Sequence, residues 1–100
     1  MPRKEDRYTF LKEVQLEFAS GKRSARISDI SLGGCYVDTI AQIPVGEVLT
    51  LHLVGTSGLP MEFKGRVAYV LEGMGFGVEF TELSDAQRDF LTQVVQSAAG

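Results

Sequence analysis

The chain has 100 residues, 44% of them hydrophobic, and a formal net charge of −3. This size suits one small domain with a single core and excludes two such domains. The only cysteine, Cys35, excludes a disulfide framework and a cysteine metal cluster, and it is compatible with the reducing cytoplasm in which we expect the protein. No apolar run approaches the roughly 18 residues that cross a membrane, so we expect no membrane insertion.

Positive charge is concentrated near the start of the chain. Residues 1–26 contain seven Lys or Arg and four acidic residues, a net +3, so the remainder carries −6. A local positive region on an acidic body suits a small anionic ligand better than a long polyanion. We therefore expect no general nucleic-acid binding.

Residues 1–9 are rich in charge and lack apolar periodicity. This composition predicts a flexible arm that leads into the first strand, with a single domain over residues 10–100.

Alternation of apolar and polar residues then predicts six β-strands separated by turns rich in Gly, Pro and Ser. The strands are expected at residues 13–18, 23–30, 35–39, 49–53, 61–71 and 76–80. The fifth run places Phe63, Val67 and Tyr69 on one face, and most aromatic residues alternate inward in this way. Gly65, in the middle of that run, marks a bulge or bend of the kind that a closing barrel requires.

A helix is expected over residues 84–98. Ser84 and Gln87 have the spacing of a capping box, in which each side chain bonds the backbone N–H of the other residue. Asp85 favours the same helix start because its charge complements the helix dipole. An apolar stripe at helical spacing should pack on the barrel and comprises Phe90, Leu91, Val94, Val95 and Ala98.

A polar and glycine-rich corner, residues 29–34, joins the second and third strands. Asp29 supplies a carboxylate and Ser31 a hydroxyl, while Gly33 and Gly34 can take positive φ and leave the backbone open to close approach. We interpret the corner as the floor of a ligand site. The alternative is a bend in which Asp29 and Ser31 only bond neighbouring backbone groups.

Two arginines at the start of the chain, Arg3 and Arg7, form an R-x-x-x-R motif about twenty residues before a D-x-S-x-x-G motif at Asp29, Ser31 and Gly34. In order and spacing these motifs resemble the PilZ domain, a bacterial receptor for cyclic di-GMP. The closing run at residues 75–80 and the single helix extend the resemblance over nearly the whole chain. The resemblance implies a mainly β fold: a six-stranded antiparallel (split) β-barrel with one C-terminal α-helix.

The resemblance also implies a role for each motif residue. Arg3 and Arg7 would contact guanine or phosphate, and Asp29 would accept hydrogen bonds from the guanine edge and set base identity. Ser31 would bond a phosphate or the base edge, with Gly33 and Gly34 keeping the backbone accessible.

One departure concerns the residue before the first motif. Many family members carry a further arginine there, where this chain has Pro2. Ligand stoichiometry therefore stays open, and so does the choice between a monomer and a ligand-linked dimer.

The expected function is that of a receptor for cyclic di-GMP, with no other cofactor and no metal. The ligand would order the arm and change the surface shown to an unidentified downstream protein. One alternative is a PilZ-type adaptor that binds protein but no nucleotide. Another is a small barrel for single-stranded nucleic acid, which requires a basic groove with exposed stacking aromatics.

We do not expect an enzyme. His52 is the only histidine, and its strand shows no evident Ser, Cys or acid partner for it.

Overall fold

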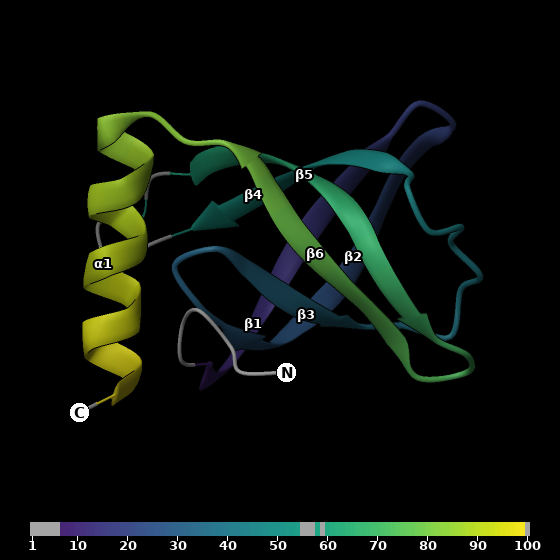
Figure 1. Cartoon of the computed structure of the whole chain (residues 1–100), viewed down its shortest axis with the longest axis horizontal. Helices are drawn as coiled ribbons and strands as arrows, with labels where there is room; N and C mark the ends of the chain where they lie inside the picture. The colour runs from purple at the N-terminus through teal and green to yellow at the C-terminus, as the bar shows by residue number, and fades with distance from the viewer. Residues whose placement is uncertain (1–6, 55–57, 59, 100) are drawn as a thin grey trace.

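A computed structural model describes residues 7–54, 58 and 60–99. All six expected strands and the expected helix are present, in the order of the sequence (Figure 1). They are β1 (Tyr8–Phe18), β2 (Gly21–Ile30), β3 (Gly34–Asp38), β4 (Val48–Val54), β5 (Pro60–Leu71), β6 (Gly75–Glu82) and α1 (Asp85–Ala99).

The strands close into an antiparallel barrel in the order β1-β2-β3-β6-β5-β4, which confirms the expected fold class. Consecutive strands pair within two three-stranded meanders, β1-β2-β3 and β4-β5-β6. Two seams join the meanders. The β3–β6 seam pairs all of residues 34–38 with residues 75–79, whereas the β1–β4 seam pairs only residues 15–17 with residues 50–52.

The barrel interior is filled by alternate side chains from every strand, as the period-two pattern predicts. Phe63 is fully buried, and its ring centroid lies 5.3 Å from that of Phe80 and 5.5 Å from that of Phe90 on the helix. Burying one such side chain stabilises the fold by about 1.5–3 kcal/mol. The fully buried set also includes Leu16, Ile27, Ile30, Leu49, Leu51, Leu53, Val37, Val67, Phe76, Val78 and Leu91.

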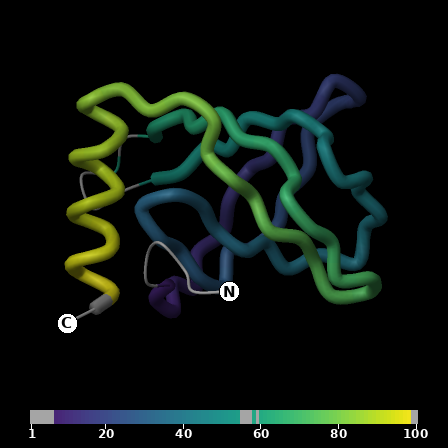
Figure 2. Tube along the Cα trace, in the orientation of Figure 1, coloured from purple at the N-terminus to yellow at the C-terminus, as the bar shows by residue number. Residues whose placement is uncertain are grey.

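Helix α1 runs across one end of the barrel, and the β5–β6 turn lies at the end away from it (Figure 2). The capping box is confirmed: the Ser84 N–H donates to Gln87 Oε1 at 2.7 Å, and the Gln87 N–H donates to Ser84 Oγ at 3.2 Å. Gln87 also donates through Nε2 to the Glu62 carbonyl at 2.7 Å, which ties the helix start to β5. Within the described residues, no helix is both long and apolar enough to span a membrane.

The register shifts at several bulges. One, between Lys64 and Gly65, confirms the irregularity expected at that glycine. An added Cβ at Gly65 would overlap the Val78 side chain, so the glycine also allows β5 and β6 to pack closely. Another shift lies between Ile27 and Asp29. It lets Ile27 and Ile30 both face the core while Asp29, which strict alternation from Ile27 would bury, stays partly exposed.

Strand β1 begins earlier than the sequence pattern indicates. Tyr8 pairs with Ile30 and Thr9 with Asp29, so two residues of the expected arm belong to the barrel. The remainder of that arm up to residue 6, including Arg3, lies outside the described residues.

Candidate functional site

Arg7 and Asp29 come together across β1 and β2. Arg7 directly precedes β1, and Asp29 pairs with Thr9 near the end of β2. The Arg7 Nη1 atom donates to Asp29 Oδ1 at 2.8 Å, and the two side chains remain 26% and 32% exposed. A guanidinium has five N–H donors and a carboxylate about four acceptor sites, so this one contact leaves capacity for a ligand. The structure thus unites one residue from each sequence motif at an accessible ion pair.

Ser31 builds the corner beside this pair. The whole residue is only 5% exposed. Its hydroxyl accepts from the Gly33 and Gly34 N–H groups at 3.2 and 3.1 Å and donates to the Gly34 carbonyl at 3.2 Å. These three bonds use its one donor and two acceptor sites. In this structure the Ser31 hydroxyl therefore bonds neighbouring backbone, which was the alternative interpretation of the corner.

Gly33 and Gly34 do not use the conformational freedom that the sequence suggested, since neither has positive φ. Gly34 instead lies so close to β6 that an added Cβ would overlap the Val78 carbonyl oxygen. The Gly33 carbonyl accepts from the Phe80 N–H at 2.9 Å, which also ties the corner to β6. In this structure both glycines therefore hold the corner close to β6.

A row of residues across four strands extends the site over the outer face of the barrel. Asp29 on β2 pairs with Tyr36 on β3, Tyr36 pairs with Gly77 on β6, and Gly77 pairs with Tyr69 on β5. The Tyr36 and Tyr69 ring centroids are 6.2 Å apart, and a Cβ added to Gly77 would overlap the Tyr69 ring. Tyr69 is 40% exposed. The tyrosine platform, defined as Tyr36, Gly77 and Tyr69, thus lies beside the Asp29 carboxylate.

Sequence reasoning missed this platform because strict alternation along β5 put Tyr69 on the inward face. A register shift between Val67 and Tyr69 breaks the alternation of inward and outward side chains along β5. Val67 is therefore buried in the barrel, whereas Tyr69 lies on its outer face. The available signal was Tyr36, which falls between the inward-facing Cys35 and Val37 and so had to face outward.

Loss of solvent and nearby negative charge both act on the Tyr36 hydroxyl of the platform. The Tyr36 hydroxyl oxygen is covered and has no hydrogen-bond partner among the described residues. Loss of solvent raises the pKa of Tyr36, and the charges of Asp38, Tyr69 and Asp29 add to that rise. The phenol therefore keeps its proton at neutral pH.

Cys35 lies behind the site, in the barrel core. Burial raises the pKa of its thiol to about 12, with a further rise from Asp29 and a partial offset from Arg7. The thiol is thus a packing group.

His52 has acid partners, contrary to the sequence interpretation. Its Nε2 lies 3.1 Å from Glu17 Oε1 and its Nδ1 lies 3.6 Å from Glu62 Oε1, so it links β1, β4 and β5 on the outer surface. In the part of the chain that the structure describes, no His, Cys, Asp and Glu side chains form a group of three that could hold a metal ion.

Comparison with known proteins gives the family. The profile of the PilZ domain matches residues 2–97. A search of curated proteins finds no significant match.

Among solved structures, the PilZ domain of CeSA from a cellulose-synthesizing bacterium has a TM-score of 0.73 at 18% identity, over 95% of this chain and 99% of that one. The Escherichia coli YcgR PilZ domain with cyclic di-GMP has a TM-score of 0.79 at 17% identity, over 99% and 92% of the two chains. The Bacillus subtilis inhibitor of motility MotI (DgrA) has a TM-score of 0.80 at 18% identity over 97% of this chain, which spans only 51% of that protein.

At these identities the solved structures support the shared barrel, while the profile match covers nearly every residue. Together with the R-x-x-x-R and D-x-S-x-x-G motifs, this profile match shows that the chain belongs to the PilZ domain family.

Proposed function

We propose that this domain is a receptor for cyclic di-GMP and not an enzyme. The observation that carries the proposal is the accessible Arg7–Asp29 pair beside an outward-facing tyrosine platform. Family membership supports it, and so does the similarity to the YcgR PilZ domain, whose structure contains cyclic di-GMP.

Each group of the ligand has a complementary group in the chain. The Asp29 carboxylate can accept from guanine N1–H and N2–H, and the Arg7 guanidinium can fork onto guanine O6 and N7 or hold a phosphate. The exposed Tyr69 ring offers a surface on which a base can stack. Ser31 acts in this proposal by holding the corner, with Gly33 and Gly34, in the shape that presents Asp29.

Arg3 is proposed as the second guanidinium. It lies outside the described residues, so its role rests on the motif and on the family. We further propose that the ligand orders residues 1–6 against β1 and β2, and that the new surface is recognised by a downstream protein in the cytoplasm. Amide exchange tests this step: residues 3–6 should gain protection at saturating ligand, and equal protection with and without ligand would contradict it.

The nucleic-acid alternative fits the platform poorly. Outward-facing tyrosines are present, but the net charge of −3 over the whole chain disfavours a long polyanion more than a small dianion.

Calorimetric titration with cyclic di-GMP and its adenine analogue tests the proposal. We expect binding of the guanine ligand to be preferred, because Asp29 and Arg7 complement guanine donors and acceptors and adenine reverses that pattern. Arg7→Ala should weaken binding about ten- to a hundredfold, as expected for a lost charge-assisted hydrogen bond.

Arg23→Ala is the matched control. Arg23 is exposed on the same strand as Asp29 but six residues away, or about 20 Å at about 3.3 Å per residue, and should leave the affinity unchanged. Failure of the unmodified domain to bind would favour the adaptor that contacts only protein. Equal affinity for both dinucleotides would mean that only the phosphates are recognised.

A further inference from the structure

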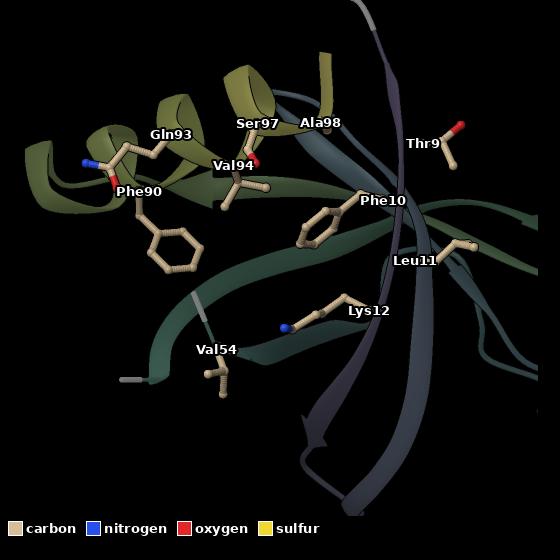
Figure 3. Close-up of a pocket in the computed structure, with 10 residues that line it drawn as sticks. All are labelled: Thr9, Phe10, Leu11, Lys12, Val54, Phe90, Gln93, Val94, Ser97 and Ala98. Carbon is tan, nitrogen blue, oxygen red and sulfur yellow. The ribbon is translucent and has the colours of Figure 1, made fainter. Parts of the chain in front are cut away.

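A cavity lies where the barrel seam is incomplete. Strands β1 and β4 pair only through residues 15–17 and 50–52, although β1 begins at Tyr8 and β4 extends to Val54. In the described residues, the first half of β1 therefore has no pairing with β4. Helix α1 lies over this gap, and a cavity of about 530 Å³, partly open to solvent, lies between the three elements (Figure 3). Its volume is in the range of small-molecule sites.

The cavity walls are mainly apolar. In Figure 3 the Phe10 ring from β1 and the Phe90 ring from α1 both point into the space beneath Val94. Val54 and Ala98 complete the apolar lining. Thr9 and Leu11 point to the other side of β1. An alkyl chain could therefore contact carbon on several sides.

A lysine stands at the mouth of this apolar space. Lys12 occupies the same strand face as Val14 and Leu16, which are 4% and 0% exposed, and it interrupts that apolar run. Figure 3 shows its ammonium group turned into the cavity between Phe10 and Val54. No ion pair among the described residues includes Lys12. A cation next to apolar walls favours a ligand that brings a negative charge.

We propose that this cavity binds a single-chain anionic amphiphile of the fatty-acid class. The carboxylate would pair with Lys12 at the mouth, and the alkyl chain would lie between Phe10 and Phe90 under α1. The site is separate from Asp29 and the tyrosine platform, none of which lines the cavity. The proposal is thus independent of cyclic di-GMP binding.

Laurate below its micellar concentration is a suitable probe, with dodecanol as its neutral counterpart. Equilibrium dialysis with the whole chain should show laurate bound at one site and more tightly than dodecanol. Lys12→Met removes the charge and keeps an apolar side chain of similar length, so it should weaken laurate about tenfold and leave dodecanol unchanged. Lys22→Met, on the distant β1–β2 hairpin, is the matched control and should change neither.

Ala98→Leu tests the location, because its added carbons fill the cavity. It should abolish binding of both probes while the domain keeps its melting temperature and its affinity for cyclic di-GMP. Absence of laurate binding, an unchanged laurate affinity in Lys12→Met, or unchanged binding in a folded Ala98→Leu variant would each overturn the proposal.

Discussion

Replacing Asp29 with asparagine separates recognition from folding at the proposed site. The change preserves the shape of the side chain but removes its charge and turns one acceptor into an N–H₂ donor. The new amide N–H₂ group would face the N1–H and N2–H groups of guanine, which are also donors, so no hydrogen bond could form between them. Loss of a charge-assisted hydrogen bond corresponds to about 1.5–3 kcal/mol, so we expect cyclic di-GMP to bind about ten- to a hundredfold more weakly.

The same change should affect stability much less. The Arg7–Asp29 contact is 2.8 Å long but its side chains are 26% and 32% exposed, so solvent screens it. An exposed pair of this kind contributes about 0.2–1 kcal/mol. A loss of 1 kcal/mol lowers the melting temperature of a domain this small by about 4–8 °C, which sets the upper limit for Asp29→Asn.

Titration calorimetry and thermal melts of the same samples measure the two effects. Asp89→Asn, an exposed aspartate on α1, is the control and should change neither affinity nor melting temperature appreciably. If Asp29→Asn bound cyclic di-GMP as tightly as the unmodified domain, Asp29 would not recognise the base and the site assignment would be wrong.

Further substitutions and treatments test four separate residues of the structure. Tyr69→Ala should weaken ligand binding by about 1–3 kcal/mol in calorimetry, whereas Tyr69→Phe should not, because stacking needs the ring alone. Ser31→Ala should cost about 1–3 kcal/mol in denaturant unfolding, because one buried and one partly buried N–H group lose their acceptor; an unchanged midpoint would contradict the turn geometry. Gly34→Ala should lower the melting temperature even more, since its Cβ would overlap β6 backbone; a neutral effect would show that β3 and β6 can separate there. Cys35 should resist thiol reagents at pH 8 until the domain unfolds, and stability should fall as pH rises from 9 towards 12, because the folded thiol keeps its proton longer than the unfolded one.

The fold was largely predictable because most strands follow simple alternation and the helix starts at a strong local signal. Ser84 and Gln87 form the expected capping box, and the apolar residues of α1 pack toward the barrel core. These features depend on neighbouring residues, which a sequence displays directly.

Bulges were harder to place, and they decide which side chains reach the outer face. The shift between Val67 and Tyr69 moves the tyrosine outward, and the shift between Ile27 and Asp29 keeps the carboxylate out of the core. Each depends on pairing with a strand distant in sequence or on closure of the barrel. Motif spacing could therefore bring Arg7 to Asp29, but it could not reveal the tyrosine platform.

The division of the barrel into two meanders has a consequence for how it folds and opens. Each meander consists of hairpins whose pairings are local, whereas the β3–β6 and β1–β4 seams join distant parts of the chain. Because non-local pairings must first overcome the entropy of loop closure, we expect the seams to form after the hairpins. Asp29 belongs to the first meander and Tyr69 to the second. A nucleotide that contacts both residues would stabilise the β3–β6 seam and so slow unfolding of the closed barrel. The short β1–β4 seam, which such a ligand does not span, would then open first.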